Sequence, residues 1–317
     1  MHLDTRKRIG QLDVSPLVLG GNVFGWTADT PTSFAVLDAY TGSGGNMIDT
    51  ADVYSAWVEG NHGGESETVI GEWLAARGSA VRDNVVIATK AGHHPDHMGL
   101  APATLKAACE DSLRRLRTDR IDLYYTHFDD ESVPVAEIIG TLDTLVKEGK
   151  VREIAASNLS PERLTASLAA SDSEGLARYV ALQPHYNLVS RDTYEGALRD
   201  IAQRESLAVL PYYALASGFL TGKYRPGEPA PEGARADKAA QHLATERGQR
   251  VLAALTAVAD AHGTSEATVA LAWLAAQPTV TAPIASARTP DQLPALLATP
   301  ALHLTQEELH LLTTASG

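Results

Sequence analysis

The chain has 317 residues, of which 44% are hydrophobic and 21% are charged, and this composition excludes a disordered protein. Its 39 acidic and 26 basic side chains give a formal net charge of −13, so its overall field repels nucleic acids and anionic membranes. Cys109 is the only cysteine, which excludes an intrachain disulfide, and its place in a helical pattern predicts an inert core residue.

The N-terminal segment "MHLDTRKRIG" has no apolar run of the kind that a signal peptide contains. No window comes near the roughly 18 uninterrupted apolar residues of a transmembrane helix. We therefore expect a cytoplasmic protein with no membrane and no nucleic-acid partner. The sequence leaves open whether it is a monomer or a homo-oligomer.

Eight short apolar segments of β-type recur along the chain, and helical patterns lie between them. Such patterns cover residues 101–116, 133–149 and 160–170, and in the last of these Ser160 is a good N-cap with Pro161 at the first helical position. Because a parallel crossover needs about a dozen residues or more, this alternation predicts a parallel sheet covered by helices. Eight such units predict an α/β fold, the closed (β/α)8 or TIM barrel. The expected strands are residues 16–21, 46–51, 84–92, 121–128, 151–158, 179–187, 207–215 and 280–286.

Two long segments interrupt this rhythm inside what we expect to be a single domain over residues 1–317. Residues 55–67 are polar and glycine-rich, and a helix is expected to begin at Glu65. Residues 217–246 are rich in proline, glycine and charge and are expected to form a long loop. Uncommonly long loops are usually functional or disordered, so we expect them at the carboxyl end of the barrel. Residues 304–317 are typical of a capped terminal helix.

Ionisable side chains stand where successive predicted strands end. Asp49 ends the second strand, Lys90 the third and His127 the fourth, while Tyr54 lies in the loop after the second. An aspartate after a strand is more often a turn or cap residue, but a lysine that ends an apolar run needs a partner for its ammonium, and Asp49 is the natural one. An adjacent ammonium would lower the pKa of a tyrosine hydroxyl, which is about 10. The four groups therefore predict proton delivery to a carbonyl oxygen, with His127 bonding that oxygen or sharing the proton.

These motifs resemble those of the aldo-keto reductase superfamily. "MIDTADVY" is similar to its Asp and Tyr motif, "VIATKAG" to its lysine strand and "DLYYTHFDD" to its histidine strand. The resemblance spans residues 8–315, and it implies a barrel closed at its base by an N-terminal β-hairpin, here residues 7–15. It also implies a nicotinamide cofactor bound without a Rossmann domain. Further similar segments, in the family's order, are residues 155–164, 182–189, 211–224 and 280–293.

The resemblance also implies roles for single residues. The implied catalytic tetrad is Tyr54, the general acid, with Asp49, Lys90 and His127. Ser157, Asn158 and Gln183 would bond the nicotinamide carboxamide, and Tyr212 would stack on its ring. Arg288 matches the loop that contacts the 2′-phosphate, so NADPH is favoured over NADH, because the donors of an arginine fork suit phosphate. The implied cofactor-binding residues are Gly21, Asn22, Asp49, Ser157, Asn158, Gln183, Tyr212, Leu215, Ala216, Ser217, Lys223, Arg235, Ser286, Arg288 and Gln292.

Aromatic side chains in or next to the loops at the strand ends are candidates for the substrate wall, since binding pockets are largely aromatic and apolar. They are Phe24, Trp26, Trp57, Tyr125 and Phe128.

Two other motifs have competing interpretations. "GNHGGESE" invites comparison with a phosphate-binding loop, but it lacks the Lys-Ser/Thr ending, so a flexible rim loop is expected. "GHHPDHMG" (92–99) groups three histidines and an aspartate as a metal site would, but its spacing matches no helical pair and Pro95 bars a regular element. We expect a solvated rim loop there and no metal.

The leading hypothesis is NADPH-dependent reduction of an aldehyde or ketone, with Tyr54 protonating the oxygen. A non-catalytic, cofactor-sensing subunit that resembles channel β-subunits is the alternative, and a cofactor-independent isomerase or lyase acting on a sugar is a third. The carbonyl substrate and the physiological direction stay open.

Overall fold

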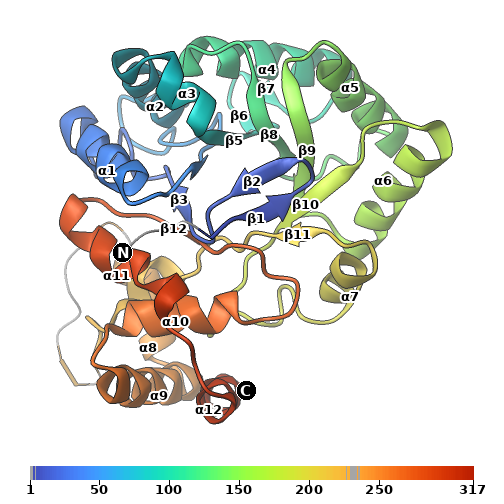
Figure 1. The fold of residues 1–317 in the computed structure, drawn as a ribbon. Helices are drawn as coiled ribbons and strands as arrows, with labels where there is room; N and C mark the ends of the chain where they lie inside the picture. The colour runs from blue at the N-terminus through green and yellow to red at the C-terminus, as the bar shows by residue number, and fades with distance from the viewer. Residues whose placement is uncertain (1–2, 4, 226, 229–233, 235) are drawn as a thin grey trace.

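This computed structural model describes residues 3, 5–225, 227–228, 234 and 236–317. Eight parallel strands form the centre of this part of the chain (Figure 1). In chain order they are β3 (Val18–Gly20), β4 (Met47–Asp49), β5 (Val86–Ala91), β8 (Ile121–Thr126), β9 (Val151–Ser157), β10 (Tyr179–Gln183), β11 (Ala208–Val209) and β12 (Ile284–Ala285). Neighbouring strands pair in the order β11-β10-β9-β8-β5-β4-β3-β12. The two edges also meet, because the Thr281 N–H donates to the Val209 carbonyl at 2.8 Å and the Ile284 N–H to the Pro211 carbonyl at 3.0 Å. The predicted (β/α)8 barrel is confirmed.

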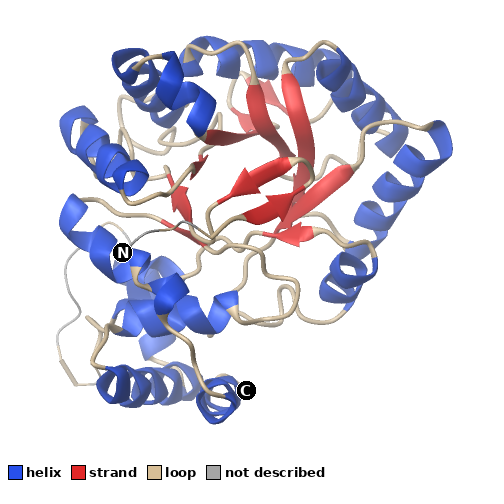
Figure 2. Ribbon diagram, in the orientation of Figure 1, coloured by secondary structure: helices blue, strands red, loops and turns tan. Residues whose placement is uncertain are grey.

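Helices surround the strands on the outside of the barrel (Figure 2). The predicted N-cap Ser160 accepts the Arg163 N–H at 3.2 Å, and Thr305 and Glu308 form a capping box at the start of the predicted terminal helix. The described helices are α1 (Thr30–Gly42), α2 (Glu65–Arg77), α3 (Ser79–Asn84), α4 (Pro102–Leu116), α5 (Val135–Lys147), α6 (Pro161–Glu174), α7 (Ala197–Arg204), α8 (Ala236–Leu243), α9 (Glu246–His262), α10 (Glu266–Ala275), α11 (Leu293–Leu297) and α12 (Gln306–Ala315). Among the described residues, no helix is long and apolar enough to cross a membrane.

Strand β5 shows how the barrel divides its side chains. All six of its residues are buried, because helices cover one face and the barrel interior the other. Ile87 and Ala91 pack in the core between strands and helices, whereas Val86 and Ala88 pack inside the barrel. By the period of two, Lys90 therefore belongs to the inward face, at the end of the strand where the chain leaves the barrel.

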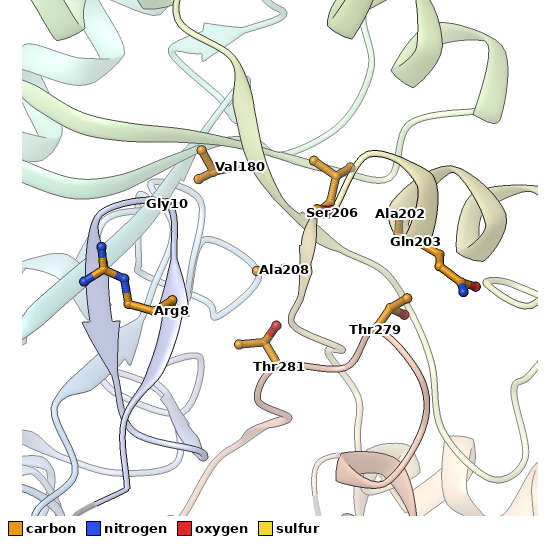
Figure 3. Close-up of a pocket in the computed structure, with 10 residues that line it drawn as sticks. Arg8, Gly10, Val180, Ala202, Gln203, Ser206, Ala208, Thr279 and Thr281 are labelled. Atoms are coloured by element: carbon orange, nitrogen blue, oxygen red, sulfur yellow. The ribbon is translucent and has the colours of Figure 1, made fainter.

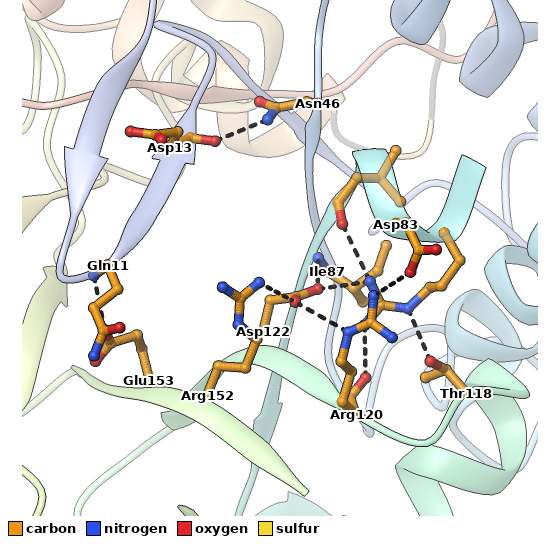
Figure 4. Close-up of polar contacts among 12 residues, drawn as sticks. Gln11, Asp13, Asn46, Asp83, Ile87, Thr118, Arg120, Asp122, Arg152 and Glu153 are labelled. Carbon is orange, nitrogen blue, oxygen red and sulfur yellow. Dashed lines mark hydrogen bonds and ion pairs between the residues drawn. The ribbon is translucent and has the colours of Figure 1, made fainter. Parts of the chain in front are cut away.

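An N-terminal hairpin, β1 (Lys7–Ile9) and β2 (Leu12–Val14), closes the base of the barrel as predicted. Figure 1 shows it lying across the centre of the strands, and its buried side chains share one apolar cluster with the barrel interior. The Gln11 N–H donates to a Glu153 carboxylate oxygen at 2.8 Å, and the Asn46 amide donates to the Asp13 carbonyl at 2.9 Å (Figure 4).

Near the hairpin, several groups compensate the negative charge of the buried Asp122 of β8 (Figure 4). The Ile87 N–H donates to it at 2.9 Å, and Arg82 and Arg152 pair with it at 2.9 and 3.2 Å. A buried carboxylate persists only when it is paired and hydrogen-bonded, so this cluster accounts for the charge at the base without assigning it a chemical role.

Two segments depart from the sequence-based expectations. The segment 217–246 contains helix α8, whose alanine-rich stretch "ADKAAQHL" favours a helix although the segment as a whole is rich in proline and glycine. The predicted rim loop at residues 92–99 contains a small antiparallel hairpin, β6 (His93–His94) and β7 (His97–Met98). Pro95 lies in its turn, where a missing N–H costs no ladder bond.

Candidate active site

A cavity of about 860 Å³ opens at the carboxyl end of the barrel. Gly20, Asp49, Ser157 and Gln183 line it, and each is the last residue of its strand. This is the end at which (β/α)8 enzymes carry their active sites. A smaller cavity of about 240 Å³ lies between the hairpin and β10 and β11 (Figure 3), and none of the predicted site residues lines it.

Lys90 is the centre of the charged groups, and its side chain is 1% exposed. Its ammonium donates to the Asp49 carboxylate at 2.7 Å, to the Thr50 carbonyl at 2.7 Å and to the Tyr54 hydroxyl at 2.9 Å. Burial alone would lower the pKa of Lys90, but the Asp49 carboxylate and the Tyr54 hydroxyl raise it above its ordinary value. The lysine is therefore held as a cation, and the partner expected from the sequence is the one it has.

Tyr54 lies in the turn after β4 and lines the cavity. The turn is tied to the loop after β3, because Ser55, which has a φ of 74°, donates its hydroxyl to the Phe24 carbonyl at 3.0 Å. Burial raises the pKa of Tyr54, and the Lys90 ammonium opposes that rise. The expectation of a lowered pKa is therefore wrong for the net effect and right for the contribution of Lys90. At neutral pH the hydroxyl keeps the proton that a general acid must donate.

His127 follows β8 and faces the same cavity, with its ring centre 6.1 Å from that of Tyr54. Burial and the nearby Lys90 ammonium hold the pKa of His127 well below its usual value, so the imidazole is neutral. Its Nδ1 atom is buried without a hydrogen-bond partner among the described residues. Because His127 lines the cavity while its Nδ1 atom is buried, the other ring nitrogen, Nε2, is the one turned toward the cavity.

A chain of hydrogen bonds connects the predicted nicotinamide-binding residues to the charged centre. The Tyr212 hydroxyl donates to Asn158 Oδ1 at 2.8 Å, and the Asn158 amide donates to the His127 carbonyl and to Ser157 Oγ at 2.9 and 3.0 Å. The Gln183 amide donates to Asp49 Oδ1 at 2.9 Å. These side chains are thus fixed relative to Lys90 before any ligand binds.

Basic side chains line the other part of the cavity. Lys223, Lys238 and Arg288 all face it, whereas Asp49 is the one acidic residue among its described lining residues and is neutralised by Lys90. In a chain of net charge −13, such a local excess of cations favours an anionic ligand.

Most predicted cofactor-binding residues line the cavity, but two of the described ones do not. Gly21 and Ala216 are buried behind its wall and line no part of it, and the Gly21 carbonyl instead accepts the Ser66 hydroxyl at 2.8 Å. Arg235 lies outside the described residues. The predicted residues that do line the cavity are Asn22, Asp49, Ser157, Asn158, Gln183, Tyr212, Leu215, Ser217, Lys223, Ser286, Arg288 and Gln292.

The aromatic wall consists of Trp26, Trp57 and Phe128, which line the cavity. The rings of Trp26 and Trp57 meet edge to face at 5.5 Å, and Trp57 is 51% exposed. Phe24 and Tyr125 were expected on this wall and are fully buried in the apolar cores instead. Tyr125 pairs in register with Lys90, so its ring fills the barrel beneath the cavity.

Sequence reasoning missed other residues at the cavity. Tyr213 and Lys238 line it, with the Lys238 ammonium 5.9 Å from the Tyr213 ring centre, and His93 lines it with its ring 4.5 Å from that of Phe128. His97 pairs with Asp111 at 2.9 Å, away from His93. Among the described residues no group of three or more His, Cys, Asp or Glu is placed to hold a metal.

Comparison with known proteins agrees with this architecture. The profile of the Aldo/keto reductase family matches residues 16–316. Protein tas of Escherichia coli is 33% identical over 94% of this chain and 93% of its own length, and the uncharacterized oxidoreductase YrpG of Bacillus subtilis is 34% identical over 95% and 92%. The putative aryl-alcohol dehydrogenase AAD14 of Saccharomyces cerevisiae is 30% identical over 94% and 82%. The chain therefore belongs to the aldo/keto reductase family and is an oxidoreductase acting on carbonyl or CH–OH groups.

Proposed function

We propose that the protein reduces an aldehyde or ketone to the alcohol with NADPH, and that Tyr54 is the general acid of this reversible reaction. The observation that carries the proposal is the Tyr54 hydroxyl, which lies 2.9 Å from the Lys90 ammonium at the floor of a cavity whose described charged lining residues other than Asp49 are basic. A neutral hydroxyl beside a permanent cation is suited to losing a proton to a substrate and regaining it later.

The hydrogen-bonding capacity left at the floor of the cavity fits a nicotinamide carboxamide. Both amide hydrogens of Asn158 are used, and its Oδ1 atom, which accepts the Tyr212 hydroxyl, has one lone pair left to accept an N–H group. The Ser157 hydroxyl donates to the Gln183 carbonyl at 2.9 Å and still has a lone pair to offer. The Tyr212 ring, held by its bond to Asn158, would stack on the nicotinamide.

The opposite part of the cavity fits the phosphates. Gly218, with a φ of +95°, exposes its backbone there, and a Cβ atom added to it would lie 3.2 Å from the Lys223 ammonium. Lys223 would face the pyrophosphate, and the forked donors of Arg288 suit a phosphate monoester such as the 2′-phosphate. This distribution of cations supports NADPH over NADH.

In the forward reaction the cofactor, when bound, would supply a hydride to the carbonyl carbon. The Tyr54 hydroxyl gives its proton to the carbonyl oxygen, and the resulting phenolate is stabilised by the Lys90 ammonium. Asp49 keeps Lys90 charged and aimed at Tyr54 through the contact at 2.7 Å. Neutral His127 orients the carbonyl oxygen by donating a hydrogen bond through Nε2.

The substrate that suits the wall is a planar aromatic carbonyl compound. Trp26, Trp57 and Phe128 offer ring faces and edges, which favour aromatic partners by about 0.5–1.5 kcal/mol per pair beyond area burial. One relative is named as a putative aryl-alcohol dehydrogenase, which is consistent with this class of substrate.

The test is NADPH oxidation, followed by absorbance, with a panel of aromatic and aliphatic aldehydes and ketones. Tyr54→Phe should lower kcat by about a hundredfold or more while NADPH still quenches protein fluorescence. Tyr179→Phe is the matched control, because it removes a hydroxyl that contacts Thr126 outside the cavity. Full activity of Tyr54→Phe would refute the assigned acid. If the protein binds NADPH but turns over no carbonyl compound, a cofactor-sensing subunit is favoured. If it does not bind NADPH and instead isomerises or cleaves a sugar, an isomerase or lyase is favoured.

A further inference from the structure

The turn that carries Tyr54 contains a second, unexplained acid, Asp52. Its residue is fully buried, and it does not line the cavity. Its backbone N–H donates to the Lys90 carbonyl at 3.1 Å, so the turn is bonded to β5 at the same residue whose ammonium contacts Tyr54. Any displacement of Asp52 would therefore change the alignment of Tyr54 with Lys90.

The side chain of Asp52 lies in the layer between the strands and the helices, where charge compensation is scarce. Neither of its carboxylate oxygens has a hydrogen-bond partner among the described residues. The N–H groups of Val53 and Gly92 favour its charged form without reaching hydrogen-bonding geometry. An unpaired carboxylate in such a place is costly, whereas a neutral carboxylic acid is much less so.

Among the described residues, the charged groups that act on Asp52 are one other carboxylate and one cation. Glu67 of α2, also fully buried, accepts from the Thr89 hydroxyl at 2.5 Å and from Arg115 of α4 at 2.7 Å. Arg115 is thus committed to Glu67. With both acids ionised the layer would carry one uncompensated negative charge.

Among the described residues, the remaining titratable groups near this layer do not supply another cation. Burial raises the pKa of the Cys109 thiol of α4 to about 12, so the thiol is neutral. Tyr124 of β8 has a buried hydroxyl without a described partner, and burial raises its pKa well above its usual value. His94 of β6 accepts the Asp96 N–H at 3.1 Å and lies against Gly63; burial and Arg115 lower the pKa of His94, so it is neutral. The Lys90 ammonium points into the barrel, on the other side of the sheet.

We propose that Asp52 is a positioning residue for Tyr54 that acts in its protonated form, and that loss of its proton displaces the turn of residues 50–55 from Lys90. This inference rests on the proposed function, because it concerns the acid of that reaction. Burial and the neighbouring Glu67 raise the pKa of Asp52 to about 8, which supports the geometric argument and places the change in a measurable range. Tyr54 and Lys90, whose pKa values are raised, and His127, whose pKa is lowered, do not titrate between pH 7 and 9.

The experiment compares the pH profiles of kcat/KM for the wild type and Asp52→Asn. With a pKa of about 8, the wild type should lose about tenfold in kcat/KM between pH 7 and pH 9. Asp52→Asn, a neutral isostere, should stay within about threefold of the wild type at pH 7 and lose less than about twofold by pH 9. Asp143→Asn is the control. Asp143 of α5 accepts the Ala177 N–H at 2.9 Å and lines no part of the cavity, so its variant should keep the wild-type profile.

An unchanged alkaline decline in Asp52→Asn would overturn the proposal, and so would a folded but inactive variant at pH 7. If the variant does not fold, carbon-detected NMR of the aspartate carboxyls in the wild type decides instead. One carboxyl titrating near pH 8 is expected, and titration of every aspartate below pH 6 would overturn the assignment. The wild-type rate at pH 7 tests the reductase proposal separately, and the NMR titration stays informative if that rate is zero.

Discussion

The ion pair between Asp49 and Lys90 leads to a prediction in which a second substitution restores stability without restoring activity. At 2.7 Å and an effective dielectric constant of about 20, the two charges attract each other by about 6 kcal/mol. Asp49→Asn removes this attraction but leaves the bonds from Lys90 to Thr50 and Tyr54, so the expected loss in the free energy of unfolding is about 3–5 kcal/mol. In the wild type, Asp49 accepts hydrogen bonds from Lys90 and Gln183 on its two oxygens, whereas the asparagine offers these two donors a single oxygen.

A second substitution, Lys90→Met, should reverse most of that loss. The double variant has no buried charge left to compensate, and a buried pair replaced by neutral groups is often close to neutral in stability. Its activity should stay about a hundredfold or more below the wild type, because no ammonium remains beside Tyr54. The assays are urea unfolding and NADPH turnover of the wild type, the single variants Asp49→Asn and Lys90→Met, and the double variant.

The pH dependence of stability adds an independent check. In the wild type the pKa of Lys90 is raised, so its contribution is fully present at neutral pH and is lost only as pH rises through that raised value. In Asp49→Asn burial dominates and the pKa of Lys90 falls below its unfolded value, so this variant should gain stability as pH rises from neutrality toward about 10. A double variant no more stable than Asp49→Asn, or a pH-independent Asp49→Asn, would refute the reasoning.

Two further predictions concern the cavity walls. Arg288→Ala should raise KM for NADPH by about tenfold to a hundredfold in steady-state kinetics, because charge-assisted hydrogen bonds to a phosphate are worth about that much. The KM for NADH should stay unchanged. An equal rise in KM for both cofactors would exclude the contact between Arg288 and the 2′-phosphate. Trp57→Ala should change the free energy of unfolding by less than about 1 kcal/mol, because the side chain is 51% exposed. It should also lower kcat/KM for an aromatic aldehyde about tenfold relative to a small aliphatic one, and parallel losses on both substrates would remove Trp57 from the substrate wall.

The charged centre could be predicted from the sequence because it depends on strand ends. In a parallel barrel every strand finishes at the same rim, so Asp49, Lys90 and His127 had to converge once the strands were placed. The position of Tyr54 depends on a turn whose geometry the pattern does not contain. Its contact with Lys90 was expected from the chemistry of proton delivery and from the family resemblance, and the structure places the hydroxyl 2.9 Å from the ammonium.

The sequence could not predict how deep in the barrel a side chain lies or which path a loop takes. A period of two places Tyr125 on the inward face of its strand, but whether an inward ring reaches the cavity or fills the barrel below depends on the stagger of the strands. Phe24 and Trp26 lie two residues apart in one loop, and one is fully buried while the other lines the cavity. Lys238 was missed because helix α8 lies in a segment whose average composition is typical of a loop.

Transfer of a labelled hydride tests the central claim most directly. NADPH carrying deuterium at both C4 positions should yield an alcohol with one deuterium on the former carbonyl carbon, in a single turnover. The same transfer in Tyr54→Phe should be slower by about a hundredfold or more at unchanged NADPH affinity. An alcohol without deuterium, or transfer by Tyr54→Phe at the wild-type rate, would contradict the account.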